Sequence, residues 1–207
     1  MRIIHEGIEG TGKSTQARLL ADHLKEKGYR VIQTMEPGGT RISLKIRELL
    51  LSMENREMDH VAELLLYNAA RVQHIKEVIG PALERGEIVI ADRFSDSTVA
   101  YQGYARGIDL QLIDSLDMIA TKKLRPDITI LFDIDVRTGL ARNKKLGKKD
   151  RLELEDISFH EKVREGFLRM AAGESGRIKV VDCSESLERV HQKVVKIISE
   201  FLKERSH

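Results

Sequence analysis

Residues near the start of the chain have the types and the spacing needed to bind a polyphosphate. Residues 7–14 read Gly-Ile-Glu-Gly-Thr-Gly-Lys-Ser and match the pattern G-x-x-x-x-G-K-[ST] in full. In such a loop, backbone N–H groups approach phosphate oxygens past the glycines, the lysine reaches the β- and γ-phosphates, and the last hydroxyl binds Mg²⁺. The residues expected to bind ATP are Gly7, Ile8, Glu9, Gly10, Thr11, Gly12, Lys13, Ser14 and Thr15.

The elements around this loop are the ones that the motif requires. The apolar pattern of residues 2–6 predicts a strand before the loop, and residues 14–20 predict a helix after it. A glycine turn that matches the pattern by chance does not call for this strand–loop–helix order. The order therefore favours a functional phosphate-binding loop.

A carboxylate and an arginine follow a second apolar strand. Residues 87–91 read as a strand buried on both faces, and Asp92 and Arg93 come directly after it. An Asp-Arg pair after an arbitrary strand would mean little. Beside a phosphate-binding loop, the carboxylate can bind Mg²⁺ and the arginine can grip a phosphate with two hydrogen bonds. We therefore expect Ser14 and Asp92 to serve the metal.

A strongly basic segment lies later in the chain. Six of the ten residues at 142–151 are Lys or Arg. Most such runs are the solvated end of a helix. Near a triphosphate site, the sharper interpretation is a flexible lid at about 142–151 that closes over the transferring phosphoryl group, with Arg142 and Lys145 among its catalytic cations.

The rest of the chain alternates between strands and helices. Further strands are expected at 29–34, 126–133 and 177–181, and further helices at 42–51, 59–79, 109–122, 136–145, 154–171 and 187–203. No linker or internal repeat interrupts the pattern. The alternation predicts one α/β domain over residues 1–207, with a five-stranded parallel sheet and helices on both faces.

The helix expected to begin near Asp59 carries two distinct faces. Tyr67 and Arg71 lie four residues apart on one face, where a surface pair and a pair in a binding site are equally good interpretations. Pro81 predicts a kink or break after this helix. Periodicity alone does not tell whether the other, apolar face is a core face or a dimer face. That apolar stripe consists of Val61, Leu65, Ala69, Val72, Ile75 and Ile79.

Composition narrows the class of protein. Hydrophobic residues make up 41% of the 207, enough for a buried core, and the formal net charge is only +2. Such a balanced charge favours neither nucleic acid nor a membrane surface as a partner. Glu6 interrupts the first apolar run, no apolar stretch approaches about 18 residues, and Cys183 is the only cysteine. These features predict a cytoplasmic protein without disulfides.

Four stretches agree in order and spacing with one known family. They are residues 6–16 around the phosphate-binding loop, 36–40 (Glu-Pro-Gly-Gly-Thr), 69–71 (Ala-Ala-Arg) and 92–103, from Asp-Arg-Phe to Ala-Tyr-Gln-Gly. Together they resemble the bacterial thymidylate kinases. The resemblance implies a P-loop nucleoside monophosphate kinase fold and Mg²⁺-dependent transfer of the ATP γ-phosphoryl group to dTMP, giving dTDP and ADP for dTTP synthesis. It also implies a homodimer, with the helix around 61–79 as a contact.

The resemblance assigns roles to particular side chains. Arg47 and Arg93 would hold the acceptor phosphate, and Glu36 would lie near the metal and the phosphates. Lys13, Arg93 and Glu9 would form the catalytic set together with the lid cations. The residues that would bind dTMP are Glu9, Glu36, Arg47, Tyr67, Arg71, Arg93, Ser97, Thr98, Tyr101 and Gln102.

Seven of these residues would face the nucleoside, and two of them, Ser97 and Thr98, would line the base pocket. Arg71 and Gln102 would read the edge of thymine, and Tyr67 would stack on the base where the family usually has phenylalanine. Tyr101 would disfavour a ribose 2′-hydroxyl, and Glu9 would approach the sugar 3′-hydroxyl.

Two positions depart from the family pattern. Met35 stands where many relatives have an arginine, and Leu146 occupies one candidate position for the catalytic arginine of the lid. The residues that could replace that arginine are Arg142, Lys144, Lys145 and Lys148.

Other functions stay open at this level. A kinase for a different nucleoside monophosphate would share the loop but would not need the set of Tyr67, Arg71, Tyr101 and Gln102. A P-loop switch would bind nucleotide and hydrolyse it slowly without an acceptor. The two departures also allow a fold that has lost turnover.

Overall fold

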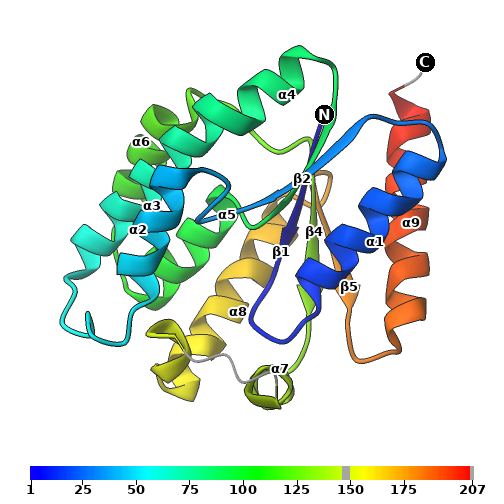
Figure 1. Ribbon diagram of the computed structural model, residues 1–207. Coiled ribbons are helices and arrows are strands. Elements are labelled where there is room, and N and C mark those ends of the chain that lie inside the picture. The colour runs from blue at the N-terminus through cyan, green and yellow to red at the C-terminus, as the bar shows by residue number, and fades with distance from the viewer. Residues whose placement is uncertain (146–149, 206–207) are drawn as a thin grey trace.

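Five parallel strands form the centre of the molecule (Figure 1). A computed structural model of the chain describes residues 1–145 and 150–205. The strands pair in the order β2-β3-β1-β4-β5, and all four neighbouring pairs are parallel. The predicted five-stranded parallel sheet is thus confirmed. The strands are β1 Arg2–Glu6, β2 Val31–Met35, β3 Ile88–Asp92, β4 Ile128–Asp133 and β5 Ile178–Asp182.

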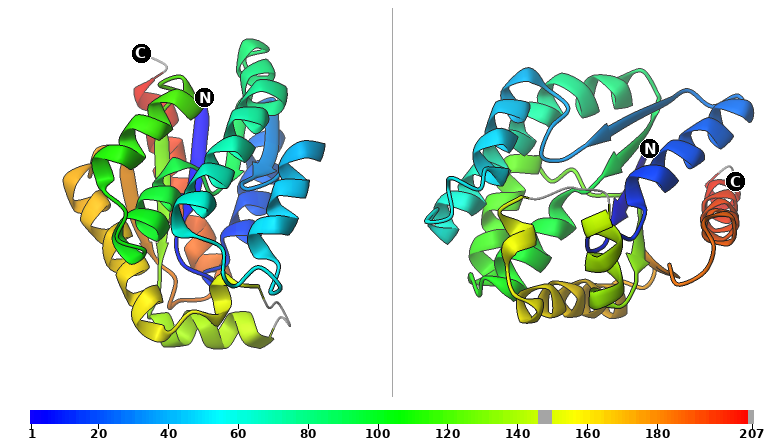
Figure 2. Two further views of the ribbon diagram at one scale, coloured as in Figure 1. Left: turned by 90° about the vertical axis from the view of Figure 1, so that its left-hand side faces the viewer. Right: turned by 60° about the horizontal axis from the view of Figure 1, so that its bottom comes forward.

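Helices connect the strands and cover both faces of the sheet (Figures 1 and 2). α1 and α9 pack together on one face, against β1, β2, β3 and β5, whereas α4 and α8 cover β3, β4 and β5 on the other. The helices are α1 Lys13–Glu26, α2 Arg41–Leu51, α3 His60–His74, α4 Gly80–Glu84, α5 Ser95–Thr98, α6 Leu110–Thr121, α7 Val136–Lys145, α8 Ile157–Gly173 and α9 Leu187–Glu204. None of the described helices is long and apolar enough to span a bilayer.

Alternate residues of each strand supply the two halves of the core. Ile3 and Ile90 pack with Leu20 of α1 in one cluster, while their neighbours Ile4 and Val89 belong to the cluster beneath the α4 side. Side chains of a strand point to opposite faces in turn, so a strand buried on both faces reads as a continuous apolar run. This explains why β3 was readily recognised in the sequence.

The apolar stripe predicted over 61–79 divides: its α3 part lies on the outside of the molecule, whereas Ile79 at its end is buried in the core beside α4. Val61, Leu65 and Val72 are 45%, 49% and 43% exposed, whereas Arg71 is only 2% exposed. The inward face of this helix therefore carries Tyr67 and Arg71, and the interpretation of these two residues as a surface pair is wrong. α3 packs between α2 and α6, which lie along the same side of the molecule (Figure 2).

Two segments contain wider π-helical turns. Residues Ile75–Ile79 join α3 to α4, so the irregularity expected at Pro81 begins a turn before the proline. Residues Val99–Ala105 follow α5 directly, although no element was predicted there. Single π turns occur often at functional sites, and this one carries both Tyr101 and Gln102.

The carboxyl ends of β1, β2 and β3 meet at one edge of the sheet. The phosphate-binding loop leaves β1 next to β3 on one side and β4 on the other. Chain connections run in opposite directions from this point, which is where open α/β sheets bind their ligands.

Candidate active site

One cavity of about 510 Å³ opens over these strand ends. Its walls come from the phosphate-binding loop, from the ends of β2 and β3, from α2 and α3, and from the π segment after α5. Segments separated by most of the chain therefore contribute to a single site. The volume is in the range of ordinary small-molecule sites.

Most of the residues predicted to form the site line this cavity. They are Glu9, Gly10, Gly12, Lys13, Ser14, Thr15, Glu36, Arg47, Tyr67, Arg71, Asp92, Arg93, Ser97, Thr98, Tyr101, Gln102 and Arg142. Gly7, Ile8 and Thr11 belong to the loop but do not line the cavity. The side chain of Lys145, and the lid candidates Leu146 and Lys148, lie outside the described residues.

The glycines of the loop serve packing as well as phosphate access. A Cβ on Gly10 would lie 2.0 Å from the carbonyl oxygen of Gly139 in α7, so only glycine fits there. Gly12 has φ 87° and caps the N-terminus of α1 without crowding any neighbour. This left-handed conformation leaves the first N–H groups of the helix free for an anion.

Lys13 is folded into its own loop. Its Nζ donates hydrogen bonds to the carbonyl oxygen of Ile8 at 2.6 Å and to Oγ1 of Thr11 at 3.3 Å. Burial, together with the nearby charge of Arg93, lowers the pKa of Lys13 to about 8, although Asp92 and Glu9 oppose the shift. The ammonium group is therefore held against the backbone of the phosphate-binding loop itself.

Ser14 and Asp92, the two residues predicted to serve the metal, meet in the cavity. Oγ of Ser14 donates a hydrogen bond to Oδ2 of Asp92. A hydroxyl and a carboxylate are ligands that suit Mg²⁺, which is often held by one or two protein oxygens together with waters and substrate phosphates. No group of three or more His, Cys, Asp or Glu side chains in the described chain could hold a metal by itself. The pair fits a metal that arrives with a nucleotide.

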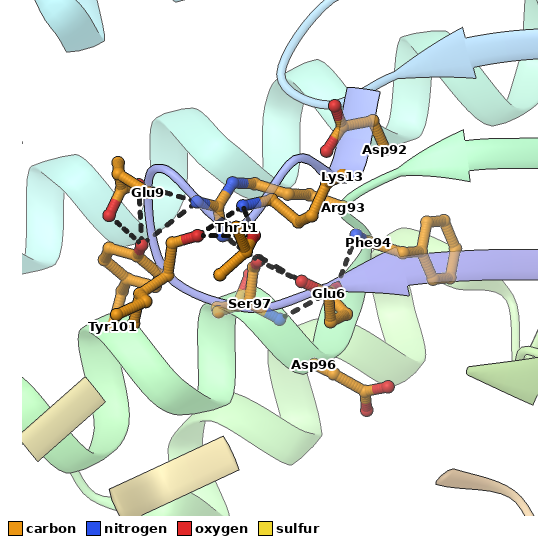
Figure 3. Close-up of polar contacts among 12 residues, drawn as sticks. Glu6, Glu9, Thr11, Lys13, Asp92, Arg93, Phe94, Asp96, Ser97 and Tyr101 are labelled. Carbon is orange, nitrogen blue, oxygen red and sulfur yellow. Dashed lines mark hydrogen bonds and ion pairs between the residues drawn. The ribbon is translucent and has the colours of Figure 1, made fainter. Parts of the chain in front are cut away.

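Glu9, Arg93 and Tyr101 converge on one point of the cavity (Figure 3). Nη2 of Arg93 donates to Oε1 of Glu9 at 2.6 Å and to the Tyr101 hydroxyl at 3.1 Å. The Tyr101 hydroxyl in turn donates to Glu9 at 2.8 Å. Arg93 has φ 72°, a conformation that costs free energy in a residue with a side chain and is found at functional sites.

Glu6 holds the segment that carries Arg93. It accepts hydrogen bonds from the backbone N–H of Phe94 at 2.8 Å and from the hydroxyl of Ser97 at 2.5 Å, and it is fully buried. Burial raises the pKa of Glu6 to about 7 against the attraction of Arg93. Sequence reasoning missed this residue, although its place at the carboxyl end of a parallel strand was a usable signal.

Arg71 is fixed by a buried polar network. Its Nε donates to Oε2 of Glu36 at 2.8 Å, and its Nη2 donates to the carbonyl oxygen of Phe94 and to Oγ1 of Thr98 at 3.1 and 3.0 Å. The other oxygen of Glu36 lies 3.0 Å from Nδ1 of His74. His74 was not predicted to take part in the site. Glu36 was expected near the metal and the phosphates, and it contacts Arg71 directly.

A second buried carboxylate stands behind Gln102. Glu63 accepts a hydrogen bond from Nε2 of Gln102 at 2.9 Å and pairs with Arg151. Glu63, Tyr67 and Arg71 follow one another at intervals of four along α3, so the helical repeat that joined Tyr67 to Arg71 could also have revealed Glu63.

The two ends of the basic segment are placed very differently. Arg142 is exposed, lines the cavity and donates to the carbonyl oxygen of Cys183 at 3.0 Å. Arg151 is buried and donates to the carbonyl oxygen of Leu50 at 3.1 Å. Arg151 is therefore an anchor on the α2–α3 side and does not line the cavity.

Comparisons with known proteins identify one family. A family model described as thymidylate kinase matches residues 5–194. A thymidylate kinase of Sulfurihydrogenibium sp. is 49% identical over 99% of this chain and 97% of its own, and one of Pelobacter propionicus is 46% identical with the same coverage. The crystal structure of thymidylate kinase from Ehrlichia chaffeensis superposes with a TM-score of 0.80, at 37% identity over 96% of this chain and 98% of that one.

The chain belongs to the thymidylate kinase family. The predicted class of enzyme, a phosphotransferase of the thymidylate kinase type, is confirmed, and so is the fold. Among the departures from the thymidylate kinase pattern, Met35 ends β2, lines the cavity and is 41% exposed. It brings an apolar surface to a wall where a cation was expected.

Proposed function

We propose that this chain transfers the γ-phosphoryl group of ATP to dTMP in a Mg²⁺-dependent reaction that yields dTDP and ADP. The observation that carries the proposal is the single cavity, in which the phosphate-binding Lys13 shares walls with Arg71, Tyr101 and Gln102. A donor polyphosphate and a small acceptor can therefore meet in one space. Membership of the thymidylate kinase family supports thymidylate as that acceptor.

The proposed phosphoryl transfer needs aligned reactants and nearby cations more than it needs a general base. The attacking oxygen belongs to a phosphate monoester, which is largely ionised at neutral pH because its second pKa is about 6. The obstacle is the repulsion between two anions. Lys13 and Arg93 face the same cavity and would oppose that repulsion, with Glu9 competing for Arg93 until the acceptor arrives.

Each group of residues has a place in this proposal. Arg93 and Arg47 bind the acceptor phosphate, Arg71 and Gln102 meet the base edge, and Tyr67 covers the base. The hydroxyl of Tyr101 and the carboxylate of Glu9 would face the sugar that joins base and phosphate. Ser97 and Thr98, one helical turn before Tyr101, complete this wall.

The metal belongs between the loop and β3. Ser14 and Asp92 would hold Mg²⁺, and the ion would supply charge neutralisation at the phosphates. The predicted lid at about 142–151 would bring Arg142 and Lys145 toward the donor from its α7 end, whereas Arg151 at its other end stays buried. Support for its position comes from Arg142, which lines the cavity at the end of α7.

We also propose a homodimer formed through α2, α3 and α6. Ten of the 17 exposed large hydrophobic residues of the described chain lie on these three helices. Apolar side chains gathered on one side of a protein mark an interaction surface. We propose a cytoplasmic location as well, because the single thiol, Cys183, is buried and unpaired.

A coupled ADP-release assay tests the function. Purified protein is supplied with ATP, Mg²⁺ and one of dTMP, dUMP, UMP, CMP, AMP or GMP, with EDTA as the metal control. We expect ADP release to require both Mg²⁺ and an acceptor, with dTMP preferred. Release without an acceptor would favour the nucleotide switch, and preference for UMP or AMP would refute thymidylate as the substrate.

A further inference from the structure

The amide of Gln102 is held by a carboxylate that lies outside the cavity. Gln102 lines the cavity, and its Nε2 donates a hydrogen bond of 2.9 Å to Oε1 of Glu63. Glu63 is fully buried on α3 and does not itself line the cavity. Any effect of Glu63 on a ligand must therefore pass through Gln102 or its neighbours.

Glu63 acts as an ionised acceptor. Its Oε2 pairs with Arg151, and Arg106 lies 3.4 Å from Oε1. Burial by itself raises the pKa of Glu63, but the hydrogen bond from Gln102 and the charges of Arg106 and Arg151 outweigh it and hold the pKa below its ordinary value. A carboxylate only accepts, so the arm of the amide that faces it is the NH₂ group.

The other arm of the planar amide is consequently a carbonyl oxygen. In the part of the chain that the structure describes, Oε1 of Gln102 accepts no hydrogen bond, and it is not among the unpaired side-chain atoms sealed from solvent. Gln102 itself lines the cavity. A ligand in the cavity therefore meets a fixed hydrogen-bond acceptor, because the amide is not free to rotate.

We propose that Glu63 is a positioning residue that fixes the Gln102 carbonyl oxygen toward ring N3 of the bound pyrimidine and so selects imide bases. Thymine and uracil carry an N–H at N3, which can donate to this oxygen. Cytosine has a lone pair at N3, so two acceptors would face each other in a buried site. The inference rests on the proposed function, in which Gln102 meets the base edge.

The test compares three acceptors, dTMP, dUMP and dCMP, in wild-type protein and in Glu63→Gln. A neutral amide at position 63 can donate as well as accept, which lets Gln102 turn its NH₂ arm toward the cavity. We expect the kcat/KM ratio of dTMP to dCMP to fall about 5- to 100-fold, the cost of one unpaired buried group. The ratio of dTMP to dUMP should not change, because both bases are imides.

Glu155→Gln is the matched control. Glu155 pairs with Arg106 at 2.7 Å, as Glu63 does at a longer distance, but among the described residues the side-chain hydrogen bond of Gln102 goes to Glu63 and not to Glu155. We expect wild-type discrimination in this variant. Equal loss of the dTMP:dCMP ratio in both variants, or no loss in Glu63→Gln, would overturn the inference.

A double variant shows whether Glu63 works through Gln102. The double variant should have the same dTMP:dCMP ratio as Gln102→Leu alone. A further loss caused by Glu63→Gln would contradict the inference. If Gln102→Leu alone leaves the ratio unchanged, the placement of Gln102 in the proposed function fails instead.

A structure of the wild-type protein with dTMP covers the case in which Glu63→Gln does not fold. Oε1 of Gln102 should lie within hydrogen-bond distance of ring N3 while Nε2 stays on Glu63. The NH₂ arm facing the base would refute the inference.

Discussion

Glu9 and Arg93 form an ion pair of 2.6 Å although 84 residues separate them in the chain. The pair joins the phosphate-binding loop to the residue that follows β3. Burial alone would raise the pKa of Glu9, but Arg93 and Lys13 outweigh it and hold this pKa below its ordinary value. The guanidinium that is proposed to bind the acceptor phosphate is therefore oriented by a carboxylate of the phosphate-binding loop.

Arg93→Lys should remove this orientation while keeping the charge. Lysine lacks the planar fork that lets Arg93 reach Glu9, Ser97 and Tyr101 together. We expect kcat/KM for dTMP to fall by about 10²- to 10³-fold, as for the loss of one donor at a reacting centre. The control is Arg164→Lys, since Arg164 forms a comparable fork with Asp133 away from the cavity. Similar losses in both variants would contradict a specific role for Arg93 in binding dTMP.

Lys13 should impose a limit on activity at high pH. Its pKa in the free protein is lowered to about 8, so the ammonium group is present below that pH and is lost above it. We expect kcat/KM for ATP, which reports the free enzyme, to decline above about pH 8. The kcat profile should decline only at higher pH, because bound phosphates favour the charged lysine. Lys13→Ala should lower kcat about 10²- to 10³-fold, and near-normal turnover would contradict the role of the loop.

The sheet and the phosphate-binding loop could be predicted because they depend on local signals, whereas the residues for the acceptor were assigned only through the resemblance to a family. β3 is a continuous apolar run, and the loop around Lys13 matches a spacing that phosphate binding requires. The outward direction of the α3 stripe could not be predicted, because periodicity defines a face but not its partner. Glu6 and Glu63 were missed for a related reason: a buried carboxylate is recognisable only once the donors that surround it are known.

Arg71→Ala should affect stability and substrate binding together. Glu36 and Arg71 are both buried, so removing the arginine leaves a carboxylate without its main partner. Breaking such a pair typically costs about 3–5 kcal/mol. Arg47→Ala is the comparison, because Arg47 is only partly buried and donates to a single carbonyl, that of Pro37. We expect both variants to raise KM for dTMP, and only Arg71→Ala to lower the urea midpoint strongly. An unchanged midpoint there would contradict the buried network.

Glu6 should make stability depend on pH near neutrality. Burial raises its pKa in the folded protein from an ordinary value of 4.5 to about 7. Between these values the folded state holds the proton more tightly than the unfolded state, so the stability due to this group is full below about pH 4.5 and is lost as the pH rises to about 7. The free energy of unfolding of wild type minus that of Glu6→Gln should fall by about 3 kcal/mol across this window. Other groups cancel in the difference, and a constant value would contradict the raised pKa.

Leu65→Glu tests the proposed dimer surface. Leu65 is 49% exposed in the middle of α3, so a charge at this position costs the folded monomer little. Buried between two copies of the chain, the same charge would lack a partner and would oppose association. Leu187→Glu is the matched control, because Leu187 is 44% exposed at the start of α9, away from α2, α3 and α6. Sedimentation at several concentrations should show a dimer for wild type and for Leu187→Glu, and a monomer for Leu65→Glu. If Leu65→Glu is still a dimer, the interface does not include the exposed face of α3.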